Sequence, residues 1–144
     1  MHKLVLAGLF HALLLGVSPD LCHAQKRGNF EFYEAAPEKH LNQKVSIYIM
    51  SVDVPALNAA SLDEDFRIFN VYTSSQDGSD TSYAKVKILK SKADMFVKRY
   101  NQSQGNGMRA FTPRNATGVF MLGEQDDPYL SGRYYLDMMS ELGK

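Results

Sequence analysis

The pattern of apolar and polar residues in the middle of the chain predicts three consecutive strands. Lys44–Val54 is apolar on both of its faces, which indicates a long strand that is covered on both sides. Strict alternation places Val45, Ile47 and Ile49 on one face and Tyr48, Met50 and Val52 on the other. Phe66–Thr73 predicts a second strand, and a turn centred on Asp77-Gly78 follows it. In Tyr83–Leu89 apolar and polar residues alternate, which is typical of a strand with one face in water.

After the third strand the apolar residues recur at a helical spacing. Ala93, Phe96 and Tyr100 fall on one face of a helix that we expect to end at Asn101. The residues Ser91–Asp94 fit a capping box, in which the serine hydroxyl and the acid three residues later bind backbone N–H groups of the first turn. We therefore expect a capped helix of about three turns.

Two or three further strands are expected in the last third of the chain. Met108–Thr112 and Thr117–Leu122 predict a hairpin whose turn lies at residues 113–115. Arg133–Met139 predicts the final strand, and residues 140–144 are expected to form a frayed tail. The predicted element order is therefore β-β-β-α-β-β, with five to six strands.

This order resembles the OB-fold, a five-stranded Greek-key barrel with a helix between its third and fourth strands. The resemblance covers residues 44–139 and rests on the order and type of the elements. Tyr33–Ile49 also resembles the start of small exported bacterial OB-like domains, in which a short helical turn, here at Pro37, leads into the first strand. A glycine commonly bends the first OB strand, and Lys44–Val54 has none, so the bend must arise elsewhere. The main alternative is an α+β sheet with a single helix.

The N-terminal residues 1–24 have the pattern of an export signal. His2 and Lys3 form a positive start, and the apolar run Leu4–Val17 is shorter than the about 20 residues that a membrane-spanning helix needs. Signal cleavage is expected after Ala24. The chain would then be exported to the periplasm or secreted, with no transmembrane segment in its mature part.

Three other interpretations of residues 1–24 are less favoured. Lipid attachment at Cys22 would need small residues before the cysteine, and Asp20 and Leu21 do not fit that requirement. A retained anchor is disfavoured by the short apolar run, and a buried N-terminal helix by the polar break that follows it. The mature chain then comprises a segment at residues 25–43 that leads into an OB-like domain at residues 44–139. We expect Phe30, Phe32 and Tyr33 to dock that segment on the core.

Removal of the signal would also remove most of the reactive side chains. Cys22 and three of the four histidines lie within residues 1–24, which leaves no cysteine and only His40. Zinc sites of the usual Cys/His kind are thereby excluded, and we expect neither a metal nor a cofactor. The acidic clusters at residues 63–65 and 126–127 lack the spacing of a known calcium loop.

Charge is balanced along the whole chain but unevenly distributed. The sequence has 16 basic and 16 acidic residues, so it lacks the basic excess of a nonspecific nucleic-acid binder. Residues 85–114 nevertheless contain eight Lys or Arg and only one acid, Asp94. This window is either a face for an anionic partner or a set of solvated side chains beside acidic neighbours.

The candidate ligand face is the wet side of the third strand together with the second strand. Tyr83, Lys85 and Lys87 share that side, and a tyrosine beside cations suits stacking on a base or sugar while a cation binds phosphate or carboxylate. The alternative is that Tyr83 packs across strands and the lysines protect an edge from aggregation. Three residues of the second strand would join this face if the register matches: Arg67, Phe69 and Tyr72.

These features favour an exported, non-catalytic binding module. Its expected partner is an oligomeric anionic ligand, either an oligonucleotide or an oligosaccharide, or else an envelope protein. One alternative is a small hydrolase with paired carboxylates, which two carboxyl groups converging in a cleft would favour. Another is a structural subunit of an envelope assembly, which a large exposed apolar patch would favour.

Overall fold

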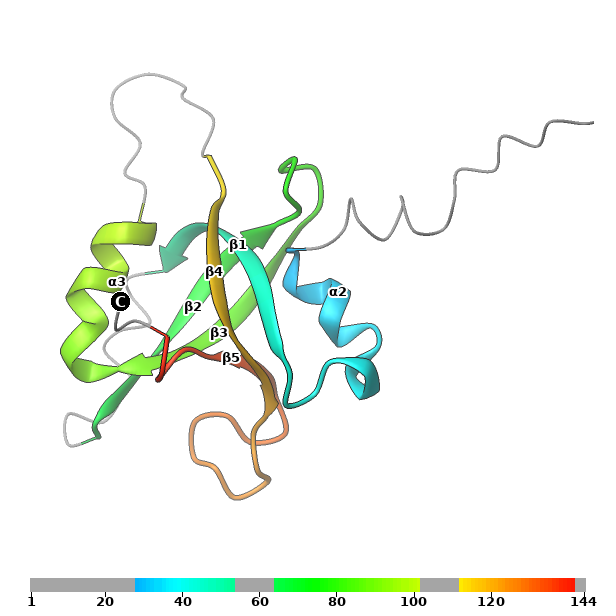
Figure 1. Ribbon diagram of the computed structural model, residues 1–144. Coiled ribbons are helices and arrows are strands. Elements are labelled where there is room, and N and C mark those ends of the chain that lie inside the picture. The colour runs from blue at the N-terminus through cyan, green and yellow to red at the C-terminus, as the bar shows by residue number, and fades with distance from the viewer. Residues whose placement is uncertain (1–27, 54–63, 102–111, 142–144) are drawn as a thin grey trace, which may run out of the picture.

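Five strands form a closed barrel in the computed structural model, which describes residues 28–53, 64–101 and 112–141 (Figure 1). The helix α3 (Ala93–Tyr100) follows the third strand, so the mainly β class and the predicted element order are confirmed. Closure excludes the open α+β sheet and is consistent with a small OB-like barrel. The strands are β1 (Lys44–Asp53), β2 (Phe66–Ser74), β3 (Thr81–Leu89), β4 (Arg114–Leu122) and β5 (Tyr134–Asp137).

The strand order around the barrel is β1-β2-β3-β5-β4. β1 pairs antiparallel with β2 and also with β4, where Lys44 lies opposite Val119. β3 and β5 are parallel, and their pairing is limited to Val86 opposite Leu136 and Lys87 opposite Asp137. The barrel is therefore closed along most of its wall by long antiparallel ladders and at one seam by a short parallel contact.

A β-bulge bends β1 where a glycine was expected in an OB-like strand. The pairing register with β2 shifts between Ile49 and Ser51. Ile47 and Ile49 are fully buried, and beyond the shift Val52 is buried as well. The expectation that Val52 shares the opposite face with Tyr48 is therefore wrong, because the extra residue at the bulge resets the alternation.

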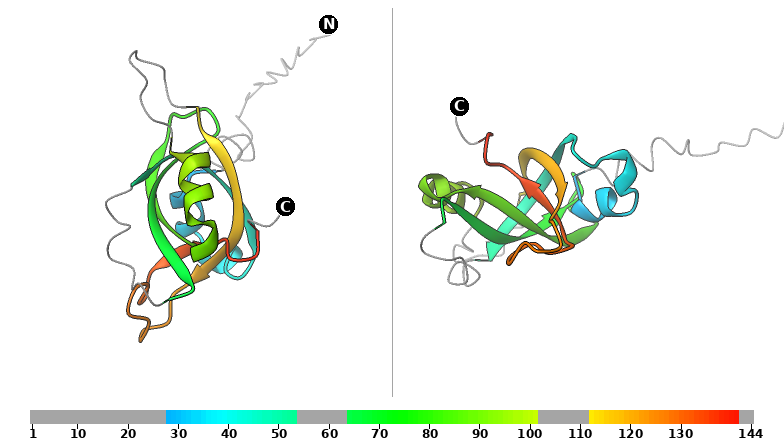
Figure 2. Two further views of the ribbon diagram at one scale, coloured as in Figure 1. Left: turned by 90° about the vertical axis from the view of Figure 1, so that its left-hand side faces the viewer. Right: turned by 90° about the horizontal axis from the view of Figure 1, so that it is seen from below.

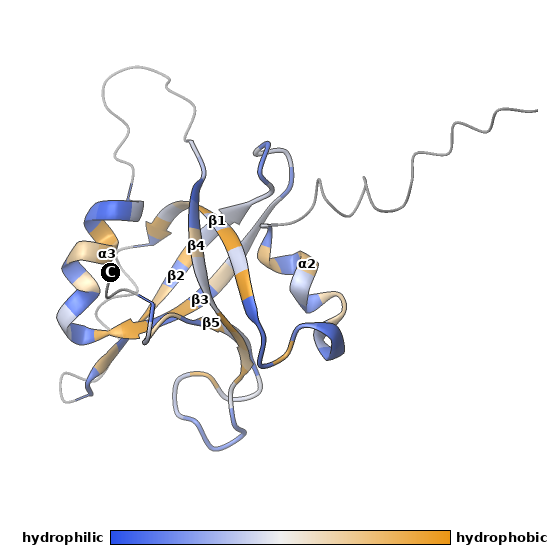
Figure 3. Ribbon diagram, in the orientation of Figure 1, coloured by the Kyte–Doolittle hydropathy of each residue, from blue (hydrophilic) through white to orange (hydrophobic). Residues whose placement is uncertain are grey.

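Short helices lie at opposite ends of the barrel (Figures 1 and 2). The helix α2 (Phe30–Glu34) and the 3₁₀ turn η1 (Pro37–Lys39) lie at one end, and the 3₁₀ turn η3 (Lys90–Lys92) leads into α3 at the other. Apolar residues alternate with polar ones along the strands between them (Figure 3). The core thus fills the barrel and continues beneath both helices.

Aromatic side chains close the end of the barrel at which α3 lies. The ring of Phe96 lies 5.2 Å from that of Phe69 and 4.9 Å from that of Tyr100, measured between centroids. The Tyr100 hydroxyl donates a hydrogen bond of 2.9 Å to the Asn115 carbonyl oxygen, which satisfies its only polar group. The helix ends at its C-cap Asn101, as expected.

The predicted capping box at this helix is wrong. Ser91 lies inside η3, and the N-cap of α3 is Lys92, which makes no side-chain cap hydrogen bond. The chain leaves β3 through a 3₁₀ turn, so the first α-helical residue comes later than the capping box requires. The amphipathic face itself is confirmed, because Ala93, Phe96 and Tyr100 are all buried.

At the α2 end hydrogen bonds accompany the aromatic packing. Asn29 caps α2 by accepting from the Glu31 backbone N–H at 3.3 Å, and its amide oxygen also accepts from the Ser82 hydroxyl. Phe30 is buried against Phe120 with ring centroids 5.5 Å apart, and the Tyr33 hydroxyl donates to the backbone of β1. The segment before β1 is therefore docked on the core, and the turn at Pro37 is confirmed as η1.

Two predictions near the C-terminus need correction. Arg114 and Asn115 belong to β4 and do not form a turn. The expected strand at Met108–Thr112 lies outside the described residues except for Thr112, which is not in a strand. The final strand is shorter than predicted and spans Tyr134–Asp137. Within the parts of the chain that the structure describes, no helix is long and apolar enough to span a membrane.

Candidate ligand-binding groove

The two faces of β3 are arranged as the alternation predicts. Ala84, Val86 and Ile88 are buried in the core. Tyr83 and Lys85 lie on the opposite side, where the Tyr83 side chain is 72% exposed. An exposed aromatic ring beside a cation is therefore present on the outer wall of the barrel.

The register between β2 and β3 decides which residues of β2 join this outer face. Tyr72 lies opposite Tyr83, and their ring centroids are 5.0 Å apart. Asn70 lies opposite Lys85, and the Lys85 Nζ donates to the Asn70 Oδ1 at 2.9 Å. Tyr72 thus takes its expected place, and Asn70 joins it without having been predicted.

Phe69 and Arg67 do not join the outer face. Phe69 is fully buried and packs against Phe96 beneath α3. Arg67 pairs with the buried Ile88, and its guanidinium donates to the carbonyl oxygens of Glu64 and Phe66 at 3.3 and 2.9 Å. Residues 67 and 69 differ from residue 72 by an odd number of positions, so a regular strand places them on the other side.

Lys87 is on the outer face but contacts Phe66 of β2. Its Nζ lies 4.3 Å from the centroid of the Phe66 ring, which is the distance of a cation–π contact. The ring of Phe66 in turn contacts Tyr129 edge-on, with centroids 5.9 Å apart. Lys87 therefore helps to hold the loop between β4 and β5 against the barrel wall.

An open groove of about 730 Å³ lies beside Lys85, between α2, β3 and the start of β5. The two strands separate beyond their short pairing at Val86 and Lys87, which leaves the seam open there. The volume lies within the range of about 300–1,000 Å³ that is usual for ligand sites. The polar lining comes from α2, from the three strands β1, β2 and β3, and from the residue before β5: Glu34, Asp53, Asn70, Tyr83, Lys85 and Arg133.

Two cations of the groove are close enough to repel each other. The pKa of Lys85 is lowered from its ordinary value of 10.5, first by burial and then by the charge of Arg133. Within the described parts of the chain the one salt bridge joins Lys44 to Glu141, with Nζ and Oε1 2.7 Å apart, so no described carboxylate pairs with Lys85 or Arg133. The groove thus holds two cations that have no ion-pair partner among the described residues.

Two carboxyl groups also line the groove. Glu34 comes from α2, and Asp53 ends β1. The pKa of Glu34 is raised above its ordinary value of 4.5, first by burial and then by the neighbouring Glu31. The groove therefore carries charges of both signs on different elements.

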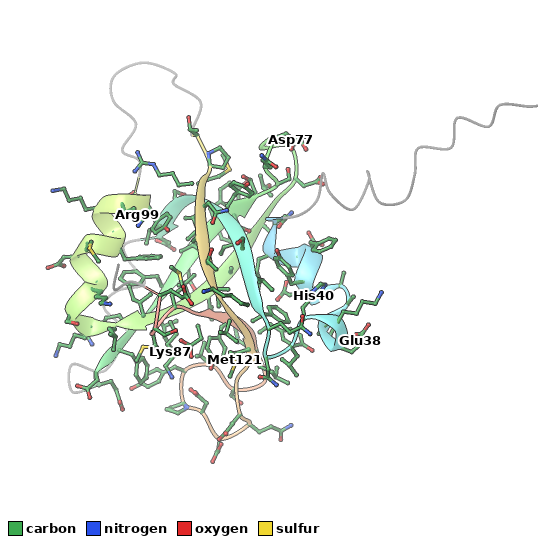
Figure 4. All side chains as sticks on the ribbon, in the orientation of Figure 1. Glu38, His40, Asp77, Lys87, Arg99 and Met121 are labelled. Carbon is green, nitrogen blue, oxygen red and sulfur yellow. The ribbon has the colours of Figure 1, made fainter. Side chains whose placement is uncertain are left out.

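The basic residues of the window 85–114 that the structure describes do not form a single face. Lys85 lies in the groove, whereas Arg99 lies on α3 at the other end of the barrel (Figure 4). Arg114 donates to the Arg99 carbonyl oxygen at 2.6 Å, and the guanidinium of Arg99 lies 5.5 Å from the centroid of the Tyr100 ring. These cations sit at the C-terminal end of α3, where the helix dipole favours them.

His40 and Asp77 do not line the groove, and each makes contacts within the fold. His40 packs against Phe32 and Tyr33, with ring centroids 5.6 and 5.1 Å away. Asp77 accepts from Ser75 and Ser79 in the turn after β2, and these hydrogen bonds lower its pKa to about 2. No group of three or more His, Cys, Asp or Glu that could hold a metal ion occurs in the described parts of the chain.

Sequence reasoning missed four polar residues of the groove. Asn70 could have been found from strand parity, because it shares a face with Tyr72. Arg133 precedes β5 and Glu34 ends α2, so they reach the groove only through the pairing of β5 with β3 and the docking of α2. The pattern around Asp53 carries no such signal, since it lies at the end of an apolar strand.

Comparison of the chain with protein-family models, with curated proteins and with solved structures gives no match. The groove and its chemistry are therefore the basis for assigning a function.

Proposed function

We propose that the protein is an exported, non-catalytic binding module that holds an oligomeric anionic ligand in the groove beside β3. One observation carries this proposal: Lys85 and Arg133 meet at an open groove next to the exposed ring of Tyr83, with no carboxylate among the described residues paired to either. Like charges held together and partly buried are unfavourable, and a bound anion would offset that cost. The resemblance to OB-like barrels, which usually bind ligands beside β2 and β3, supports the same location.

Each of these side chains has a distinct part in binding. Asn70 holds the Lys85 ammonium in place through a hydrogen bond of 2.9 Å. The Arg133 guanidinium can bind a carboxylate or phosphate with two parallel hydrogen bonds. The Tyr83 ring offers an apolar face for a sugar or a base.

Calorimetric titration with anionic oligomers tests this proposal. We expect at least one of a carboxylated oligosaccharide, a sulfated oligosaccharide and a single-stranded oligonucleotide to bind. The double variant Lys85→Glu/Arg133→Glu should weaken that binding at least tenfold. The matched control is Lys98→Glu, which reverses a charge on α3 outside the groove and should leave affinity unchanged. Equal effects of the two variants would refute the groove as the site.

Export is part of the same proposal and rests on the pattern of residues 1–24. Its test is the mass of the protein recovered outside the cytoplasm of a bacterial host. A chain that begins at Gln25 is expected, and recovery of the full-length chain in the cytoplasm alone would contradict it.

A carboxylate hydrolase is the second candidate, because Glu34 and Asp53 line the same groove. The raised pKa of Glu34 would suit a general acid, and Asp53 would supply the second carboxyl group. New reducing ends released from an acidic oligosaccharide, and lost in Glu34→Gln, would favour this function. Binding without release of reducing ends favours the binding module.

The envelope-subunit alternative gains no support from the described surface. The exposed large apolar residues there are Tyr83, Met95 and Leu122, which belong to three different elements. Three exposed apolar residues on three elements are not evidence of the large apolar patch that marks an assembly interface.

A further inference from the structure

The mixture of charges in the groove points to a particular class of ligand. Resting on the proposed function, we infer that the groove binds an acidic oligosaccharide, with its anionic group at Lys85 and Arg133 and its hydroxyl groups at Asp53 and Glu34. Three features of the groove support this ligand over a nucleic acid.

The first feature is the presence of carboxylates beside the cations. Carboxylates accept hydrogen bonds from sugar hydroxyls, and such charge-assisted bonds are stronger than neutral ones. The same groups repel phosphates, and sites for single-stranded nucleic acid are lined by positive charge along the backbone. Because Glu34 and Asp53 face the groove together with Lys85, an oligonucleotide meets repulsion where a sugar finds hydrogen-bond acceptors.

The second feature is a polar row across three strands. Asp53 lies opposite Asn70, and Asn70 lies opposite Lys85, so an acceptor, an amide and a cation follow one another across the outer wall. Neighbouring strands are about 4.8 Å apart. The carboxylate at one end of this row can accept hydrogen bonds from sugar hydroxyls. The ammonium at the other end can bind a carboxylate substituent of the same sugar chain.

The third feature is the aromatic surface. Tyr83 is 72% exposed, but the plane of Tyr72 is tilted by 49° from that of Tyr83. The two rings therefore do not form a continuous flat platform for successive bases. A single exposed ring instead suits the C–H face of one sugar unit.

Titration with three probes of equal length tests the ligand class: a hexuronate oligosaccharide, the corresponding neutral oligosaccharide and a single-stranded oligonucleotide. We expect the acidic oligosaccharide to bind at least tenfold more tightly than either of the others. Lys85→Glu/Arg133→Glu should remove this preference over the neutral sugar.

Substitution of the acids separates sugar recognition from simple charge attraction. Glu34→Gln/Asp53→Asn should weaken the acidic oligosaccharide about tenfold or more, because charged acceptors are replaced by neutral amides. The same variant should bind the oligonucleotide more tightly, because repulsion is removed. Glu38→Gln, on the exposed turn η1 outside the groove, is the matched control and should change neither affinity.

The outcomes distinguish this inference from the proposed function. Tighter binding of the oligonucleotide than of the hexuronate would overturn the inference and leave the anionic binding module intact. Binding of the hexuronate that depends on Lys85 but not on the two acids would overturn the assignment of the hydroxyl contacts. Binding of none of the three probes would count against both proposals, provided that circular dichroism shows the variants to be folded.

Discussion

The two ends of the barrel are closed by different kinds of contact. At the α3 end, Phe96 is fully buried between the rings of Phe69 and Tyr100. At the α2 end, Asn29 and Ser82 join by a hydrogen bond beside the buried ring of Phe30. One end is sealed chiefly by apolar contact, and the other is partly held by polar groups.

This difference separates stability from binding. Burial of a large aromatic ring contributes more free energy than one hydrogen bond, whose net contribution is about 1 kcal/mol. The groove lies at the less fully sealed end, where α2 and the start of β5 leave part of the β3 edge uncovered. We therefore expect substitutions at the α3 end to affect mainly unfolding, and those at the α2 end to affect both unfolding and ligand affinity.

The largest effect is expected for Phe96→Ala at the α3 end. The side chain is fully buried, so its removal should lower the free energy of unfolding by about 3–5 kcal/mol. The neighbouring Met95 is 51% exposed, so Met95→Ala should stay within about 0.5 kcal/mol of the wild type. Denaturation by urea, followed by circular dichroism, measures both. Similar losses of unfolding free energy in the two variants would contradict the conclusion that buried apolar contacts stabilise the α3 end.

A smaller loss is expected for Asn29→Ala at the α2 end. The variant removes the cap acceptor for the Glu31 N–H and the partner of Ser82, at a cost of about 1–2 kcal/mol. Asn29→Asp keeps an oxygen acceptor at the helix start and should recover most of this loss. If Asn29→Ala costs as much as Phe96→Ala, the contrast between the two ends fails.

The pKa of Lys85 provides a test of the electrostatics at the α2 end, where the groove lies. Its lowered pKa means that the folded protein releases the Lys85 proton before the unfolded chain does, so this group adds stability as pH rises from that pKa to 10.5. Arg133→Met should raise the pKa of Lys85 towards its ordinary value, because a like charge is removed, although burial still lowers it. Nuclear magnetic resonance of the lysine Cε reports the midpoint. An unchanged midpoint in Arg133→Met would contradict the electrostatic repulsion between Lys85 and Arg133.

The smallest effect is expected for Glu34→Gln. The pKa of Glu34 is raised, so the folded protein holds this proton more tightly and loses stability from this group as pH rises from 4.5 through the raised value. Glu34→Gln lacks this loss, so the variant should be slightly more stable than the wild type at pH 7 and equal to it below pH 4.5. Thermal unfolding across this range measures the difference, and a constant difference at all pH values would contradict it.

The strand pattern predicts the barrel well because alternation is a local property. It places Ala84 inside and Tyr83 outside, and the structure agrees. It misjudges Val52, because the bulge after Ile49 depends on the register with β2 and leaves no glycine or other mark in the sequence. The helix start is misjudged for a related reason, since the 3₁₀ turn at Ser91 is set by how the chain leaves the barrel wall.

The groove is predicted only in part, because its residues meet through non-local contacts. Tyr83 and Lys85 lie on one strand, and their common face follows from sequence alone. Phe69 is an aromatic residue close to this face in sequence, but strand parity places it on the buried side. Arg133 and Glu34 come from distant segments, and their approach to Lys85 depends on the closure of the barrel.

The double pairing of β1 also sets the order in which this chain can become a folded protein. β1 bonds with β2, its immediate successor, but its other edge bonds with β4, where Ser46 lies opposite Thr117. A ribosome must therefore synthesise the chain as far as β4 before the first strand has both neighbours. Because closing such a long loop is slow relative to local hairpin formation, barrel assembly should wait for the C-terminal strands. Truncation within β4 would leave one edge of β1 as a template for intermolecular pairing.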